Sequence, residues 1–118
     1  MTQNEQPQSY LTELRRGTLT LAVLGSLGKP CYGYALLTEL QAKGIAMEAN
    51  TLYPLLRRLE SQGLLDSDWD TGESRPRKYY TLNATGRQTL QALLAEWHKL
   101  ERSLKSICAE ENDDVYFN

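Results

Sequence analysis

A chain of 118 residues has room for one domain with at most one appended element. Its composition, 41% hydrophobic and 24% charged, is that of a soluble globular protein, and no apolar run approaches the ~20 residues of a membrane helix. Two cysteines, Cys31 and Cys108, and one histidine, His98, form neither a disulfide framework nor a metal site. With no nucleophile motif or phosphate-binding loop, the sequence predicts no cofactor and no enzyme. The polar start does not resemble a signal peptide, so we expect a cytoplasmic protein.

The charges are unevenly distributed along the chain. The net charge of −2 gives no indication of nucleic-acid binding. However, residues 75–87 contain three arginines and one lysine with no acid, whereas residues 110–118 contain four acids with no base. Phosphate contact depends on such a local basic segment and not on the average of the chain. We therefore expect the acidic end to lie away from any nucleic acid.

The first half of the chain predicts two helices after a short polar segment. Residues 1–9 are polar, and we expect them to be disordered. From Tyr10 the apolar spacing predicts a helix over residues 10–27, which glycines and a proline then end. A second helix is predicted over residues 33–43, with Gly44 at its end.

A third, shorter helix follows directly. Asn50 or Thr51 is the expected cap, four leucines recur at helical spacing, and Gly63 ends the helix. Two helices joined by a short turn, the second short and capped, are typical of a helix-turn-helix. Residues 64–69 and 78–82 then predict two strands around a polar turn. A hairpin in this place is a wing.

The last predicted helix, residues 85–108, carries an apolar seam with alternating steps of three and four residues. Such a seam on a terminal helix indicates pairing with a second copy of the chain; the alternative is that the helix folds back on its own domain. The expected fold is mainly α with a small β-hairpin: a winged helix-turn-helix over residues 10–84, a dimerisation helix over residues 85–109 and an acidic tail over residues 110–118. The seam consists of Leu90, Leu93, Trp97, Leu100, Leu104 and Ile107.

Several of these segments resemble the PadR family of regulators. Residues 50–65 resemble its recognition-helix signature, residues 75–86 resemble its wing, and residues 16–19 and 32–34 match its first two helices. The likeness extends from about residue 11 to 108 in the same order and spacing. One departure is Asn50, where many members have glycine; asparagine also tolerates turn conformations.

The resemblance implies a winged-helix repressor of the short form, which has a single helix after the wing and dimerises through its first and last helices. It adds Leu11 and Leu14 to the expected dimer contacts. Some members bind planar aromatic compounds at the dimer centre, where a tryptophan of the last helix stacks on the ligand. Trp97 stands at the matching place, and Tyr10, Leu14 and Leu93 would line the same cavity. From spacing alone, a tryptophan in a heptad seam is most often plain core, and that interpretation of Trp97 stays open beside the ligand role.

Helix-turn-helix proteins read bases with the first residues of the second helix of the pair. Asn50 and Thr51 suit base edges, and the hydroxyl of Tyr53 suits a phosphate oxygen. The alternative is that Asn50 and Thr51 only cap the helix while Tyr53 packs on the wing. Of Arg57 and Arg58, one should reach the groove wall or a phosphate. The alternative for the other is a pair with an acid such as Glu60 or Glu39. The expected contacts of this region are Tyr34, Ala49, Asn50, Thr51, Tyr53, Arg57 and Arg58.

The predicted wing adds Arg75, Arg77 and Lys78 as phosphate contacts. Tyr79 and Tyr80 point to opposite faces of their strand, so one should be core and the other, assigned as Tyr80, should touch the DNA backbone. We therefore expect a homodimer that binds an inverted repeat in double-stranded DNA and represses transcription, with release by a small aromatic ligand and no role for a membrane. The alternative is a winged-helix protein-interaction module that binds no DNA, which the acidic whole-chain balance favours.

Overall fold

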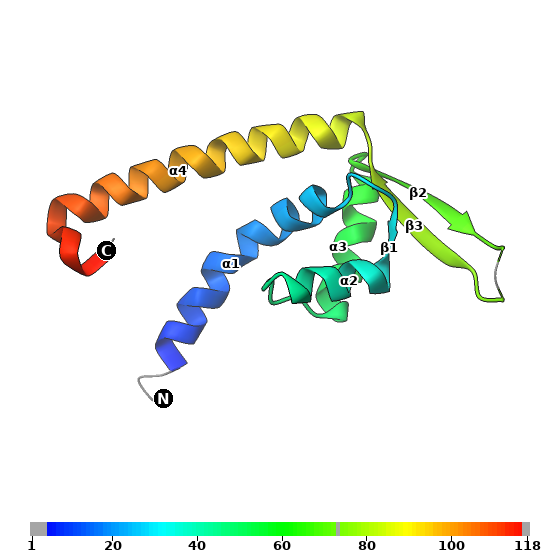
Figure 1. The fold of residues 1–118 in the computed structure, drawn as a ribbon, viewed down its shortest axis with the longest axis horizontal. Coiled ribbons are helices and arrows are strands. Elements are labelled where there is room, and N and C mark those ends of the chain that lie inside the picture. The colour runs from blue at the N-terminus through cyan, green and yellow to red at the C-terminus, as the bar shows by residue number, and fades with distance from the viewer. Residues whose placement is uncertain (1–4, 73, 117–118) are drawn as a thin grey trace.

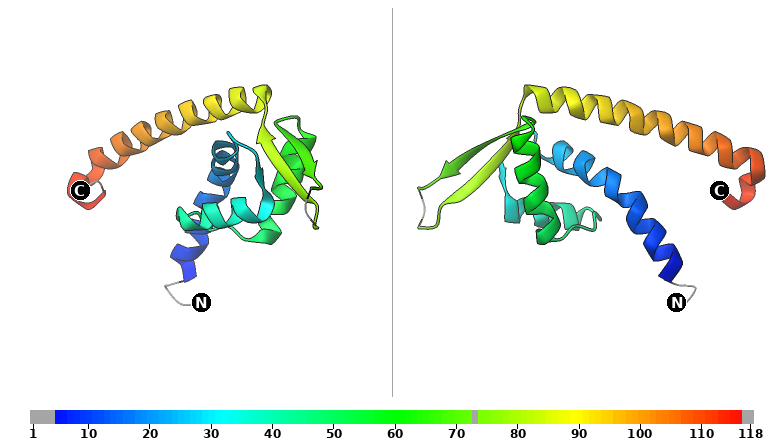
Figure 2. Two further views of the ribbon diagram at one scale, coloured as in Figure 1. Left: turned by 45° about the vertical axis from the view of Figure 1, so that its right-hand side comes forward. Right: turned by 180° about the vertical axis from the view of Figure 1, so that it is seen from behind.

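The computed structural model describes residues 5–72 and 74–116, with side chains placed for residues 7–72 and 74–109. The elements in chain order are α1 (Glu5–Ser26), β1 (Cys31–Tyr32), α2 (Gly33–Ala42), α3 (Ala49–Ser61), β2 (Leu65–Asp70), β3 (Arg77–Leu82) and α4 (Ala84–Tyr116). Helices α2 and α3, the end of α1 and the sheet form one block, from which the β2–β3 hairpin projects on one side (Figure 1). On the other side α1 and α4 diverge, and they stay apart in the further views of Figure 2.

The hydrophobic core lies where the last turns of α1 meet α2, α3 and the base of the hairpin. Its fully buried side chains come from all three helices, because the leucines of each recur on one face. They are Val23, Leu24, Leu27, Leu36, Leu40, Leu52, Leu56 and Leu59. The core stops at about the middle of α1, since residues 7–17 are all exposed. The N-terminal half of α1 therefore stands free of its own domain.

The sheet has three antiparallel strands in the order β1-β3-β2. The two-stranded hairpin was predicted, but β1 was not: Cys31 and Tyr32 were assigned to the start of the second helix, whereas they pair with Tyr80 and Tyr79 of β3. Two residues are too few to show the alternation that marks a strand. β1 covers only these two positions of β3, so the stretch of β3 nearer the hairpin tip has no neighbour on that side.

Three predicted helix boundaries differ from the structure. α1 begins at Glu5, inside the segment expected to be disordered, and α4 continues to Tyr116, through most of the predicted acidic tail. α3 begins at Ala49 after Glu48, which has extended backbone and makes no side-chain cap, so the predicted caps Asn50 and Thr51 lie inside its first turn. The predicted ends at Gly44 and Gly63 agree with positive φ angles of 88° and 82° there.

The junction between the sheet and α4 is held by Asn83 and Gly86. The Asn83 side chain accepts a hydrogen bond from the Gly86 amide at 2.8 Å, which caps α4, and donates to the Gly63 carbonyl at 3.0 Å and to Asp66 at 3.1 Å. A Cβ on Gly86 would overlap the backbone carbonyl of Leu64. The start of α4 is thus packed directly against the segment that follows α3. Among the described residues, no helix is long and apolar enough to cross a membrane.

Candidate nucleic-acid interface

Helix α3 has one buried face and one exposed face. Its four leucines are buried, whereas Ala49, Asn50, Thr51, Arg57 and Arg58 are all exposed. The positions predicted to read DNA are therefore on the surface, on the face that the core leaves open. Both arginines are outside every ion pair found in the described part of the chain, so the alternative that one of them pairs with Glu60 or Glu39 is not seen.

The start of α2 fixes the position of Tyr53. Gly33 is buried, and a Cβ added to it would overlap the Tyr53 ring. Tyr53 is half-buried and packs against the core from its edge. The ring is thus held against the first turn of α2, which explains why glycine is needed at position 33.

Between α2, α3 and the wing lies a cleft of about 500 Å³, which we call the tyrosine cleft. It opens along the part of β3 that β1 does not cover. Phenolic hydroxyls and guanidinium groups are good donors to phosphate oxygens, so the cleft suits the backbone of a nucleic acid. Its lining residues are Tyr32, Gly33, Tyr34, Tyr53, Arg75, Arg77, Lys78 and Tyr80.

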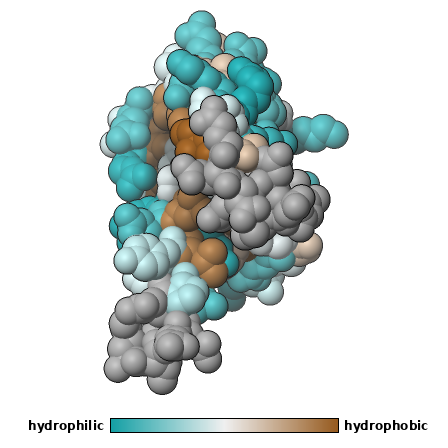
Figure 3. Space-filling view, turned by 90° about the vertical axis from the view of Figure 1, so that its left-hand side faces the viewer, coloured by the Kyte–Doolittle hydropathy of each residue, from teal (hydrophilic) through white to brown (hydrophobic). Residues whose placement is uncertain are grey.

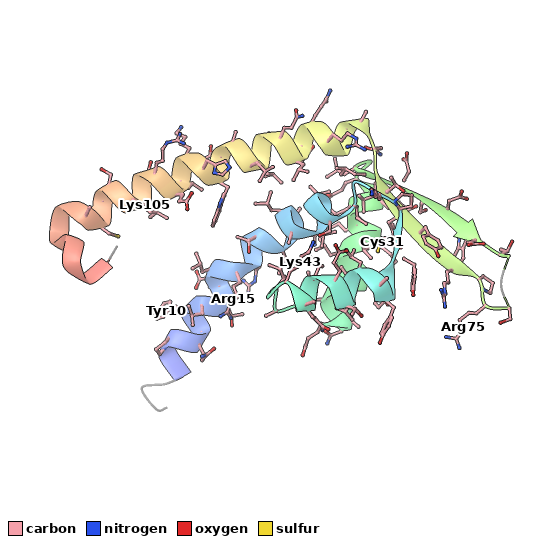
Figure 4. All side chains as sticks on the ribbon, viewed as in Figure 1. Tyr10, Arg15, Cys31, Lys43, Arg75 and Lys105 are labelled. Atoms are coloured by element: carbon pink, nitrogen blue, oxygen red, sulfur yellow. The ribbon has the colours of Figure 1, made fainter. Side chains whose placement is uncertain are left out.

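Two arginines supply the charge of this cleft. The Arg77 guanidinium lies over the Tyr32 ring, 4.6 Å from its centroid, and the Tyr32 and Tyr79 rings pack edge to face at 5.5 Å. Arg77 is therefore held in place while it still faces the cleft. Arg75 is exposed beside the hairpin tip (Figure 4). Tyr32 was missed by the sequence reasoning, and its position opposite Tyr79 in the β1–β3 pair is what brings it here.

Lys78, predicted to contact phosphate, makes an ion pair within the protein. Its Nζ lies 2.9 Å from Oε1 of Glu60, and the Ser67 hydroxyl donates to Oε2 of the same carboxylate. The Ser67 hydrogen bond and then that of Lys78 lower the pKa of Glu60, and the bond to Glu60 raises the pKa of Lys78. Lys78 thus joins α3 to the wing and is already paired within the protein.

Tyr80 belongs to the core and also forms part of the floor of the tyrosine cleft. It is 5% exposed and belongs to the same cluster as Leu65 and Leu82. Because so little of its surface is open, Tyr80 has less room for a DNA contact than its neighbours in the cleft, and its predicted contact with the DNA backbone stays a prediction. The half-buried Tyr79 is on the opposite face, next to Tyr32.

The outer face of the hairpin is acidic. Asp66, Asp68 and Asp70 of β2 are exposed and alternate along the strand, so they share one face. Asp70 stands opposite Arg77 in the register. The sequence reasoning missed this stripe because it considered the charges of residues 75–87 and 110–118 only, although the alternate spacing of the aspartates was visible. The register places these aspartates on the same face as Tyr79 and Arg77, so acidic and basic side chains lie side by side on this face of the wing.

A second candidate site lies between α1 and α4. An apolar groove of about 530 Å³, here called the seam groove, contains Leu14, Leu93 and Trp97. Figure 3 looks into this side and shows apolar side chains gathered there. Tyr10, which was predicted to line the same cavity, is 71% exposed and is not among the lining residues. The full lining is Leu14, Gly17, Thr18, Leu21, Leu93, Glu96, Trp97, Leu100, Glu101, Leu104 and Lys105.

The predicted dimer contacts are largely unburied in the single chain. Leu11, Leu14 and the seam residues from Leu93 to Ile107 are between 36% and 69% exposed, with Trp97 at 42%. The exception is Leu90, which packs against the core of its own domain. The seam therefore does not fold back on the chain beyond its first position.

A family model described as the transcriptional regulator PadR-like family matches residues 20–92, more than half of the chain. The chain belongs to the PadR-like family of transcriptional regulators. The matched segment runs from the second half of α1 through the whole winged helix into α4, and so includes the tyrosine cleft. The PadR-like match thus assigns the chain to DNA-binding transcriptional regulation.

Individual PadR-like proteins agree with this assignment. A PadR family transcriptional regulator from Eggerthella lenta is 46% identical in sequence, and its crystal structure matches this one with a TM-score of 0.84 over 92% of this chain and 93% of that one. A PadR-like transcription factor from Bacteroides fragilis is 32% identical, with a TM-score of 0.71 over 84% and 98%. The transcriptional regulator Rv3488 of Mycobacterium tuberculosis is 33% identical over 81 residues, 68% of this chain and 76% of that protein.

Proposed function

We propose that this PadR-like chain is a homodimeric repressor that binds an inverted-repeat operator and is released by a planar aromatic ligand. The observation that supports it most directly is the exposed apolar seam of α4, together with the exposed, basic side of α3 and the wing. Contiguous apolar surface of this kind on a small protein marks an interface. A two-fold axis through the paired α1 and α4 helices would present two copies of α3 to successive major-groove turns, about 34–36 Å apart.

In this proposal the contacts divide by type. Ala49, Asn50 and Thr51 lie in the first turn of α3 and face the base edges, and Arg57 and Arg58 lie along the groove wall. The phosphate contacts come from the tyrosine cleft and the wing tip, that is, from Tyr34, Tyr53, Arg75 and Arg77.

The ligand part of the proposal rests on the seam groove. Its volume of about 530 Å³ is in the range of small-molecule sites, and the exposed ring of Trp97 supplies a flat apolar surface. Two glutamates, Glu96 and Glu101, against one lysine, Lys105, line the groove, which favours a cationic aromatic over an anionic one. A ligand releases DNA only if it binds the DNA-incompetent arrangement of the dimer more tightly, so the ligand and the operator should weaken each other's binding by the same factor.

Two measurements test the proposal. Sedimentation equilibrium with a mobility shift on the chain's own upstream region should give a dimer that binds one inverted repeat. A stable monomer that ignores this DNA in dilute salt would instead support a protein-interaction module.

For the ligand, Trp69→Phe leaves Trp97 as the single tryptophan. Its fluorescence should be quenched by planar aromatic cations, and the same compounds should lower operator affinity; no quenching by any of them would leave Trp97 as interface packing.

A further inference from the structure

On the side of α1 away from the seam groove lies a second, larger groove, of about 740 Å³. We call it the arginine groove. One wall is α1, with Thr12, Arg15, Arg16 and Leu19, and the other is the turn from Gly44 to Glu48 followed by Thr51 of α3. Figure 4 shows Arg15 on α1 beside the end of α2. The groove thus separates the free half of α1 from the beginning of α3.

The groove is positively charged. Arg15 and Arg16 are exposed, and neither belongs to an ion pair found within residues 7–72 and 74–109. Glu48 is the single acid among the lining residues, so two cations face one carboxylate. The Thr51 and Leu52 amides bond to the Glu48 backbone carbonyl, while its side chain makes no cap, so the positive end of the α3 dipole faces this groove. The site has the charge that suits a phosphate backbone.

The arginine groove is continuous with the proposed DNA surface. Thr51 lines it, and Tyr53, two residues further along α3, lines the tyrosine cleft. The beginning of α3 therefore lies between two basic grooves, one on the side of α1 and one on the side of the wing. Figure 1 shows the same order across the molecule, with α1 on one side of α3 and the hairpin on the other.

We infer that Arg15 and Arg16 bind the phosphate backbone on the side of the recognition helix opposite the wing. This inference rests on the proposed function and extends its site to α1, an element that the sequence reasoning assigned to dimerisation. The backbone of the duplex then passes α3 in contact with the protein on both sides. The α1 contacts lie nearer the seam, and so nearer the centre of the inverted repeat, than those of the wing.

The test is the salt dependence of operator affinity for Arg15→Gln/Arg16→Gln, measured by fluorescence anisotropy. Each phosphate neutralised contributes about 0.9 to the slope of log affinity against log salt. A dimer that loses four contacts should therefore show a slope shallower by about 3.6, so that wild type loses roughly 100-fold more affinity than the variant between about 50 and 200 mM salt. Arg15→Lys/Arg16→Lys, which keeps both charges, should keep most of the slope.

The matched control is Lys99→Gln/Arg102→Gln, which removes the same charge from exposed positions of α4 outside both grooves. It should leave the slope near that of wild type. Equal slopes for the two double variants would overturn the inference while the proposed function stands. Loss of the dimer in the α1 variant alone, by sedimentation, would also overturn it and would assign the groove to a contact between chains. A wild-type protein that ignores the operator would overturn the proposed function itself.

Discussion

The two adjacent basic residues of β3 should respond differently to salt. Arg77 faces the tyrosine cleft with no acid paired to it among the described residues, whereas Lys78 is bound to Glu60 at 2.9 Å. Arg77→Gln removes two phosphate contacts from a dimer, so the salt slope should fall by about 1.8, and wild type should lose roughly 10-fold more affinity than the variant between about 50 and 200 mM salt. Lys78→Gln should change the slope by much less than the value of about 0.9 expected for each lost phosphate contact, because the charge of Lys78 is already neutralised by Glu60.

Anisotropy titrations of a labelled operator over a salt series give these slopes directly. Lys78→Gln should instead be seen in stability, lowering the free energy of unfolding by about 1 kcal/mol, since the Glu60 carboxylate loses one of two partners and is still partly solvated. Arg102→Gln serves as the charge control for both. A slope change for Lys78→Gln as large as that for Arg77→Gln would show that the Glu60 pair opens on DNA, and the division of roles would be wrong.

Three further predictions concern the scaffold. Gly86→Ala should lower the free energy of unfolding by about 1–3 kcal/mol, since the new methyl group overlaps the Leu64 carbonyl, while Gly25→Ala meets open space and should not destabilise in thermal melts; equal melting points would contradict the close packing. Because the pKa of Glu60 is lowered in the folded state, its carboxylate stabilises the fold at pH values above its ordinary pKa of 4.5, and this contribution is lost as the pH falls through the folded-state pKa. Urea titrations at a series of pH values should therefore show a weaker loss of stability on acidification for Glu60→Gln than for wild type. Leu104→Glu should abolish the dimer in sedimentation with little effect on helix content, because the side chain is 54% exposed in the single chain; an intact dimer would place the interface elsewhere.

Much of the fold could be predicted because its signals are local. The leucines of α3 recur at helical spacing within one segment, and Gly63 ends the helix through a backbone conformation that favours glycine. The hairpin and the long final helix follow in the same way from strand alternation and from the seam. Such features depend on neighbours in sequence, and their existence and order agree with the structure even where their ends differ.

The site was harder to predict because it depends on pairings between distant segments. The sequence places Lys78 in a basic run, but only the packing of α3 on the wing brings Glu60 to it, 18 residues away. Likewise Tyr32 reaches Arg77 only through the β1–β3 pairing, and no local pattern marks a two-residue strand. Tyr79 and Tyr80 were correctly placed on opposite faces, but nothing in the sequence said which face packs on the core.

The contacts of Asn83 and Gly86 couple the start of α4 to the segment that follows α3. Asn83 bonds to the Gly63 carbonyl and to the Gly86 amide, and Gly86 packs against the Leu64 carbonyl. In the proposed dimer, a small change in the angle between the two α4 helices would therefore change the distance between the two α3 helices. A ligand bound near Trp97 would then alter the fit of the two α3 helices to successive major-groove turns without contacting either of them.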